Sequence, residues 1–294
     1  MIKLSGLGVA MVTPFNSNGQ VDYPALQRLT EHLVESCDFL VIMGTTGETP
    51  TLSVDEQRSV LDFVIEINNK RLPVVVGLGG NNTAALCDRI KNFDFKGVDA
   101  VLSASPYYNK PSQEGIFQHF TAVADASPKP IILYNVPGRT GSNMAASTTV
   151  RLADHKNITA IKEASGDLIQ IDEVIRNKPD DFSVLSGDDG LTLAMIGSGA
   201  DGVISVIGNA LPKRFGGMVH QALFGQVLEA KEMHHKLSPI IDAIFEEGNP
   251  AGIKTVLDIL NICDDAVRLP LVPATKNLRN KLYSCLADLD VDLA

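Results

Sequence analysis

Residues 158–166 read ITAIKEASG, a short apolar run that ends at Lys162 and is followed by a turn containing Gly166. A run of this length with β-branched residues is typical of a buried strand. A lysine at the end of such a strand either extends its ammonium group to water or takes part in chemistry. The rest of the chain decides between these two interpretations.

Seven more runs of this kind recur along the chain. With the first they form this series: LGVAMV (7–12), FLVIM (39–43), PVVVG (73–77), DAVLS (99–103), IILYN (131–135), ITAIK (158–162), FSVLS (182–186) and GVISV (202–206). Segments with helical spacing separate them, and one of these opens with a capping box at Ser53 and Glu56. Continuously apolar runs that alternate with helices predict parallel strands buried on both faces.

Eight such units predict a TIM (β/α)8 barrel over residues 1–224. A doubly wound open sheet is the competing fold, but no dinucleotide fingerprint follows the first strand. GLGGNN (77–82) lacks the Lys-Ser/Thr pair of a phosphate-binding loop. Residues 225–294 contain helical patterns and no strand pattern, so we expect a C-terminal helical domain packed on the barrel.

The composition narrows the class of protein. The 294 residues are 45% hydrophobic and carry a net charge of −10, which argues against a broad nucleic-acid surface. No apolar run approaches the roughly 20 residues of a membrane helix, and we interpret the N-terminal segment as a first strand rather than a signal peptide. The cysteines at 37, 87, 263 and 285 form no C-x-x-C pair. We therefore expect a cytoplasmic protein with no membrane partner.

Active sites of such barrels lie at the carboxyl ends of the strands. The polar residues there fall in five stretches: GTTGE (44–48), SPYYN (105–109), YNVPGRTG (134–141), Lys162 and SGDD (186–189). Each stretch has a structural interpretation. GTTGE is a tight turn or equally a nest for a carboxylate, and the tyrosines could simply pack. Taken alone, Arg139 is a loop residue, and Asp188 and Asp189 are expected to cap the next helix.

Lys162 has the two most different interpretations. Spacing alone favours a side chain that reaches water from a strand end. In a barrel mouth, however, loss of solvation disfavours the charged amine. A neutral amine can attack a ketone, form a Schiff base and make the neighbouring carbon acidic. Such a site also needs a carboxylate holder and a proton shuttle, which GTTGE, Arg139 and the tyrosines could supply.

The chain resembles the dihydrodipicolinate synthase/N-acetylneuraminate lyase family of pyruvate-dependent class I aldolases, nearly end to end. The stretches that carry the resemblance are GTTGE, SPYYNKPSQEG, YNVPGRTG, IKEASG, LSGDD, GVISV, NPAGIK (249–254) and RLPLVP (268–273). The resemblance implies a barrel enzyme that uses a covalent imine with pyruvate, with neither a metal nor an added cofactor. It also implies a homotetramer built as a dimer of dimers.

The resemblance implies roles for eight residues. In catalysis, Lys162 forms the imine, Tyr134 passes protons, and Thr45 links Tyr134 to Tyr108, which reaches into the neighbouring subunit's site. For substrate binding the residues are Thr46 for the pyruvate carboxylate, Arg139 for the carboxylate of aspartate semialdehyde, and Gly187 with the Ile204 carbonyl as pocket lining.

Substrate choice rests on Thr45 and Arg139. Neuraminate lyases of the family usually read GSTGE and lack the arginine context, so the resemblance favours condensation of pyruvate with L-aspartate-4-semialdehyde to 4-hydroxy-tetrahydrodipicolinate, in lysine and diaminopimelate biosynthesis. The alternative is a related aldolase for N-acetylneuraminate or 2-keto-3-deoxy sugar acids. A catalytically silent barrel would require loss of a site residue, and none is lost. A phosphate-binding barrel fits poorly with the acidic SGDD stretch.

Two departures from the family pattern stand out. The positions that match the family's lysine-effector site are Thr49, Pro50, Val54, Gln57, Asn81, Ala85 and Tyr107. Feedback-inhibited members have histidines at 54 and often 57, and a glutamate at 85. Without that glutamate the effector's ammonium group has no acidic partner, so we expect weak or absent inhibition by lysine. The second departure is Gly252, where the family often has a proline.

Overall fold

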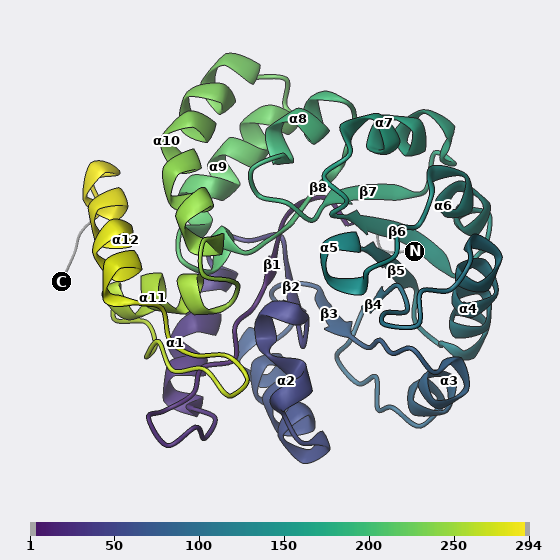
Figure 1. Ribbon diagram of the computed structural model, residues 1–294, viewed down its shortest axis with the longest axis horizontal. Coiled ribbons are helices and arrows are strands. Elements are labelled where there is room, and N and C mark those ends of the chain that lie inside the picture. Colours follow the sequence, from purple (N-terminus) through teal and green to yellow (C-terminus); the bar gives the residue numbers. More distant parts are fainter. Residues whose placement is uncertain (1–3, 292–294) are drawn as a thin grey trace.

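Eight parallel strands pair in sequence order and close into a barrel in the computed structural model, which describes residues 4–291. The strands are β1 (Gly6–Ala10), β2 (Phe39–Ile42), β3 (Val74–Gly77), β4 (Ala100–Ala104), β5 (Ile131–Asn135), β6 (Ile158–Glu163), β7 (Ser183–Ser186) and β8 (Gly202–Ser205). Each lies within or beside one of the apolar runs, so the expected (β/α)8 barrel is confirmed. Figure 1 shows the strands at the centre of a ring of helices.

The helices around the barrel follow the strands in turn. They are α1 (Tyr23–Val34), α2 (Val54–Asn68), α3 (Thr83–Lys91), α4 (Gln113–Ala126), α5 (Pro137–Thr140), α6 (Ala146–Ala153), α7 (Leu168–Asn177), α8 (Thr192–Gly197) and α9 (Pro212–Leu223). Short 3₁₀ turns cover Thr45–Gly47, Thr49–Thr51 and Ile207–Asn209. The capping box at α2 is present as expected: Ser53 Oγ accepts from the Glu56 amide, and the Glu56 carboxylate accepts from the Ser53 amide.

Three further helices form the C-terminal extension: α10 (Val227–Phe245), α11 (Ala251–Ile259) and α12 (Lys276–Asp288). They lie together on one side of the barrel (green to yellow in Figure 1), where α10 packs on α8 and α9. Gly225, with a φ of 78°, turns the chain from α9 into α10. The helical character expected after residue 224 is confirmed, whereas the division into two domains stays a prediction.

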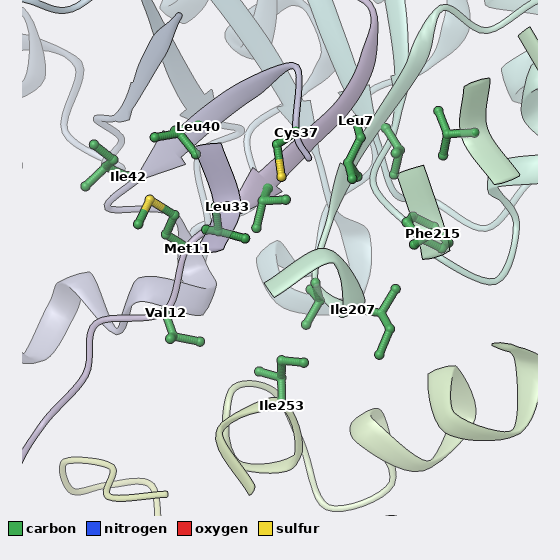
Figure 2. Close-up of a cluster of buried hydrophobic side chains, with 14 of the residues drawn as sticks. Leu7, Met11, Val12, Leu33, Cys37, Leu40, Ile42, Ile207, Phe215 and Ile253 are labelled. Carbon is green, nitrogen blue, oxygen red and sulfur yellow. The ribbon is translucent and has the colours of Figure 1, made fainter. Parts of the chain in front are cut away.

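The extension shares its core with the barrel. Figure 2 shows Ile253 of α11 among the side chains of Val12 and Ile207, which belong to the barrel end. A β-carbon added at Gly252 would lie 2.2 Å from the Ile244 carbonyl oxygen. Glycine therefore lets α11 start directly against the end of α10, which gives the departure at this position a packing reason.

A second apolar cluster fills the inside of the barrel. It includes Val41, Leu102, Leu185 and Ile204, and Tyr134 lies among them. The β5–β6 register places Tyr134 opposite Lys162 and Asn135 opposite Glu163. Successive side chains of a strand alternate in direction. The pair Tyr134 and Lys162 therefore points into the barrel, and the pair Asn135 and Glu163 points outward.

Candidate active site

A cavity of about 670 Å³ opens at the carboxyl ends of the strands. Six of the eight residues expected at the site line it: Thr45, Thr46, Tyr134, Arg139, Lys162 and Gly187. They lie at the ends of β5 and β6 or in the segments after β2, β5 and β7, so the barrel brings together residues that are up to 142 positions apart (187 − 45). Residues from four of the five predicted polar stretches therefore share this cavity, whereas no residue of SPYYN (105–109) lines it.

Lys162 lines the cavity with only 5% of its surface exposed. Its Nζ atom is 4.6 Å from the centre of the Tyr134 ring. The interpretation of Lys162 as a strand-end lysine that reaches water is therefore wrong, because the ammonium group stays inside the barrel mouth. A buried amine next to a phenol has the chemical groups that imine formation requires.

Gly187 makes room beside this lysine. A β-carbon added at position 187 would lie 3.1 Å from Lys162 Cε and 2.7 Å from the Ala164 β-carbon. The Gly187 amide also donates to the Glu163 carbonyl at 2.8 Å. Glycine is therefore needed here because the backbone just after β7 passes directly against the lysine side chain.

The turn after β2 carries Thr45 and Thr46 to the cavity. Thr46 is 3% exposed, and its Oγ1 accepts a 3.0 Å hydrogen bond from Asn249 Nδ2. Thr45 is exposed and lies at the rim near Tyr134. The hydroxyl groups expected to hold a carboxylate thus lie on the same cavity as Lys162.

Arg139 lies on the single-turn helix α5 at the mouth of the cavity, with an exposed side chain. Gly141 ends this turn in a left-handed conformation, with a φ of 74°. A guanidinium group at a cavity mouth can bind the carboxylate of an incoming substrate with two parallel hydrogen bonds. Its expected role as an anion-binding group is compatible with this position and stays a prediction.

Two expected site residues lie outside the cavity. Tyr108 is 88% exposed and adopts a φ of 73°, a backbone conformation that is strained for a tyrosine. No hydrogen bond joins Tyr108, Thr45 and Tyr134 within the described chain, so the expected relay is not closed in one subunit. Ile204 is buried in the same apolar cluster as Tyr134 inside the barrel, and Val206, two residues later, lines the cavity.

The profile of the dihydrodipicolinate synthetase family matches residues 3–289. The chain belongs to this family. Two relatives named 4-hydroxy-tetrahydrodipicolinate synthase come from Phocaeicola vulgatus, 50% identical over 98% of both chains, and Flavobacterium psychrophilum, 52% identical over 94% of this chain and 95% of its own.

Solved structures of family members share the fold. The dihydrodipicolinate synthase of Thermotoga maritima superposes with a TM-score of 0.94 at 38% identity, over 97% of this chain and 98% of its own. The chloride-inhibited Acinetobacter baumannii enzyme, solved with pyruvate, has a TM-score of 0.94 at 39% identity, over 97% of this chain and 99% of its own. Another structural relative, with a TM-score of 0.94 and 38% identity, over 97% of this chain and 96% of its own, is described as a monomeric variant.

Sequence reasoning missed a pair of buried polar residues behind the site of this family member. Asn135 and Glu163 follow Tyr134 and Lys162, and their side chains meet outside the barrel, with both Glu163 oxygens 3.1 Å from Asn135 Nδ2. The Ser165 amide donates to the same carboxylate at 2.7 Å. Burial raises the pKa of Glu163, and these donors oppose the shift. The available signal was an acidic residue directly after a buried strand lysine.

Asp189 was expected to cap α8, and this expectation is wrong. Its carboxylate is buried and accepts from the Val206 and Ile207 amides at 3.0 and 2.7 Å, so it anchors the turn after β8. Burial raises the pKa of Asp189 to about 6, and the nearby charge of Lys162 opposes this shift. Asp188 accepts from the Gly190 and Leu191 amides, just before α8 begins.

A smaller cavity of about 200 Å³ shares Tyr134 with the first cavity as a lining residue. Thr49, Pro50 and Tyr107 line it, as do Thr45 and Arg89. Arg89 donates to Gln57 Oε1 at 2.6 Å. This arginine, which was not predicted from the sequence, therefore contacts one of the positions matched to the family's effector site. Burial lowers the pKa of Arg89.

Among residues 4–291, His, Cys, Asp and Glu form no group of three or more that could hold a metal ion. Within the same residues, no helix is both long enough and apolar enough to cross a membrane.

Proposed function

We propose that this chain condenses pyruvate with L-aspartate-4-semialdehyde through a Schiff base at Lys162 and releases 4-hydroxy-tetrahydrodipicolinate. One observation carries the proposal: a buried lysine amine lies 4.6 Å from a phenol ring, in a cavity that also contains hydroxyl groups and an arginine. Relatives of about 50% identity are named for this product, and a structural relative was solved with pyruvate.

The first half-reaction takes place at Lys162. The neutral amine attacks the ketone carbon of pyruvate, and loss of one water molecule leaves an imine. Tyr134, whose ring centre is 4.6 Å from Lys162 Nζ, exchanges the protons that this dehydration requires. Thr46 holds the pyruvate carboxylate through its hydroxyl group, which orients the ketone toward the amine.

The second half-reaction uses the acidity that the protonated imine gives to the pyruvate methyl group. Loss of a methyl proton forms an enamine, whose carbon attacks the aldehyde of the second substrate. The amino group of that substrate then attacks the imine carbon, closes the ring and frees Lys162. Arg139 binds the carboxylate of the semialdehyde during these steps. No added cofactor is needed, because the lysine itself is the electron-withdrawing group once protonated as an imine.

We further propose that the reaction serves lysine and diaminopimelate biosynthesis in the cytoplasm, in a tetramer built as a dimer of dimers. Tyr108 then completes the site of a partner subunit. The exposure and the strained backbone of Tyr108 support this placement. The four cysteines are unpaired, which fits a reducing compartment.

Trapping with borohydride tests the proposal. Pyruvate plus borohydride should add one reduced pyruvyl group per chain, detected by intact mass, and Lys162→Ala should abolish the adduct. Lys110→Ala, at the same rim beside Gly141, is the matched control and should keep it. An adduct that survives Lys162→Ala would overturn the proposal. Assays of the purified enzyme with the semialdehyde and separately with sugar acids then identify the second substrate.

A further inference from the structure

The turn that carries Thr45 and Thr46 is not held by the barrel alone. It forms one 3₁₀ turn over Thr45–Gly47 and then places Glu48 in the left-handed region, with a φ of 51°. From the barrel, Thr13 Oγ1 donates to the Gly47 carbonyl at 2.7 Å. A left-handed residue other than glycine costs of order 1 kcal/mol or more and persists only where the surroundings fix it.

Glu48 is fixed by the C-terminal extension. Its side chain is fully buried, and Oε1 accepts from Lys254 Nζ of α11 at 2.6 Å. The Arg268 amide donates to Oε2 at 3.0 Å. Lys254 is also fully buried and donates to the Ala266 carbonyl at 2.8 Å. Both ends of this ion pair are therefore hydrogen-bonded, as a buried pair requires.

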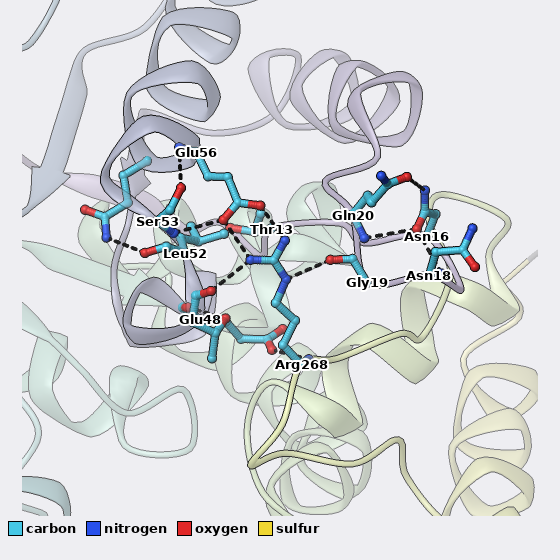
Figure 3. Close-up of polar contacts among 12 residues, drawn as sticks. Thr13, Asn16, Asn18, Gly19, Gln20, Glu48, Leu52, Ser53, Glu56 and Arg268 are labelled. Carbon is cyan, nitrogen blue, oxygen red and sulfur yellow. Dashed lines mark hydrogen bonds and ion pairs between the residues drawn. The ribbon is translucent and has the colours of Figure 1, made fainter.

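Arg268 fastens the same loop to α2. Its guanidinium group donates to both oxygens of Glu56 and to the Gly19 carbonyl, as Figure 3 shows. It also donates to the Thr51 carbonyl at 2.8 Å. The pairing with Arg268 holds the pKa of Glu56 at about 2. The loop before α12 is thereby hydrogen-bonded to Gly19, which precedes the Thr45–Glu48 turn, and to Thr51 and Glu56, which follow it.

Asn249, five positions before Lys254, reaches the other end of the turn. Its Nδ2 donates to Thr46 Oγ1 at 3.0 Å, and Asn249 lines the cavity. Because the Thr46 oxygen accepts this bond, the Thr46 hydroxyl proton is left free to donate to a ligand. Asn249 Oδ1 is buried and has no hydrogen-bond partner within residues 4–291.

We propose that the C-terminal extension is a working part of the active site, in which Asn249 and Lys254 position the turn that binds the pyruvate carboxylate. Lys254 sets the backbone through Glu48, and Asn249 sets the direction of the Thr46 hydroxyl proton. Both are positioning residues, and the inference rests on the proposed function. It predicts that the barrel residues 1–224 do not form a complete pyruvate site without the extension.

The ion pair is tested by replacing both partners, because removal of one partner would leave a buried charge. The variant Glu48→Gln/Lys254→Met should still bind pyruvate, with a half-saturating concentration for adduct formation about tenfold higher. The control is Asp258→Asn/Arg279→Met, a 2.5 Å ion pair between α11 and α12. This control should leave pyruvate saturation unchanged even where it lowers the melting temperature.

Asn249 gives a second test that does not depend on the ion pair. Asn249→Ala removes one donor, whereas Asn249→Asp presents an acceptor that captures the Thr46 hydroxyl proton. Aspartate should therefore raise the half-saturating pyruvate concentration more than alanine, although it is closer to asparagine in size. A side chain that only fills space would give the opposite order.

The outcomes separate the two proposals. Absence of an adduct in the unaltered enzyme would refute the proposed function. Normal adduct formation, together with unaltered pyruvate saturation in the Asn249 variants and the ion-pair variant, would refute the role of the extension alone. If the ion-pair variant does not fold, the two Asn249 variants decide the question.

Discussion

Lys162 and Glu163 are adjacent in the chain, but their side chains lie on opposite faces of β6. Lys162 points into the cavity, and Glu163 meets Asn135 on the outside of the barrel. Because Asn135 and Glu163 are paired across the β5–β6 ladder, their contact fixes the register that sets Tyr134 beside Lys162. Glu163 thus holds the strand register that places Tyr134 beside Lys162.

Glu163→Gln tests this role. The new amide group would face the amide of Asn135, so one donor is left without an acceptor in a buried site. We expect a loss of about 1–3 kcal/mol in the free energy of unfolding, measured with urea. Adduct formation with pyruvate should also slow, because the pairing of Tyr134 with Lys162 loosens.

The reciprocal swap is the matched control. Asn135→Asp/Glu163→Gln restores one donor and one acceptor between β5 and β6, and it should recover part of both losses. Equal stability of the single variant and the unaltered enzyme would show that the contact does not hold the register.

At the scale of elements, the strands were predictable and their distant partners were not. Each strand can be recognised from its own residues, as an apolar run before a turn. The capping box at Ser53 can be recognised in the same way, because it is a four-residue pattern. Glu48 pairs with Lys254, which lies 206 positions later in the chain. The spacing of apolar residues in the sequence does not predict such a contact. Asp189 shows the same limit, since a local capping rule was applied to a carboxylate that instead binds the amides after β8.

Only the site residues that lie at predicted strand ends could be identified from the sequence. The rim residues Thr45, Tyr134, Arg139 and Lys162 share a cavity because parallel strands bring their carboxyl ends together. Asn249 was not foreseen as a site residue because it lies in the extension, after the last strand. Tyr108 lies on the expected loop, but the structure of one chain leaves it exposed.

An ion pair joins α9 to the start of β2 and gives a pH-dependent contribution to stability. His220 Nε2 and Asp38 Oδ2 are 2.7 Å apart, and Asp38 also accepts from the Leu7 amide. The hydrogen bond with Asp38 raises the pKa of His220 above its usual 6.5. The charged histidine is thus favoured in the folded state, so its contribution is complete below pH 6.5 and declines as pH rises through the folded-state pKa.

His220→Gln removes this contribution. Relative to the variant, the unaltered enzyme should be more stable near pH 6, and the difference should shrink as pH rises toward 8.5. Chemical unfolding at a series of pH values measures it. Asp38→Asn should flatten the same profile, and a difference that grows with pH would contradict the assignment.

At the scale of the whole molecule, the second cavity would face a partner chain in the proposed tetramer. Tyr107 lines it at 45% exposure, and Asn81 donates to the Tyr107 carbonyl at 3.2 Å. Of the other effector-site positions, Val54 is apolar and 77% exposed, and Ala85 offers no charge. Arg89, which forms no ion pair within residues 4–291, adds a positive charge to this cavity.

Lysine should therefore inhibit this enzyme weakly or not at all. The ammonium group would meet Arg89 without an acidic partner, which disfavours binding. We expect an inhibition constant above about 1 mM, measured in the coupled condensation assay. Arg89→Leu/Ala85→Glu supplies the missing charge and should strengthen inhibition, whereas strong inhibition of the unaltered enzyme would contradict this account.

The placement of Tyr108 in a partner's site can be tested by complementation between chains. Lys162→Ala keeps Tyr108 but has no imine-forming amine, and Tyr108→Ala keeps the amine but lacks the tyrosine. Each variant alone should have low turnover. If Tyr108 of one chain serves Lys162 of another, co-expressed chains with different affinity tags should form mixed oligomers with recovered activity.

The matched pair is Lys162→Ala with Tyr134→Phe. Tyr134 lies 4.6 Å from the lysine of its own chain, so mixing these two variants cannot rebuild an intact site and should recover no activity. Sedimentation of the unaltered enzyme gives the association state at each assay concentration, and turnover should fall as dilution separates the chains. A fully active monomer would show that Tyr108 is not needed in the site of a partner chain. Equal recovery of activity in both mixtures would lead to the same conclusion.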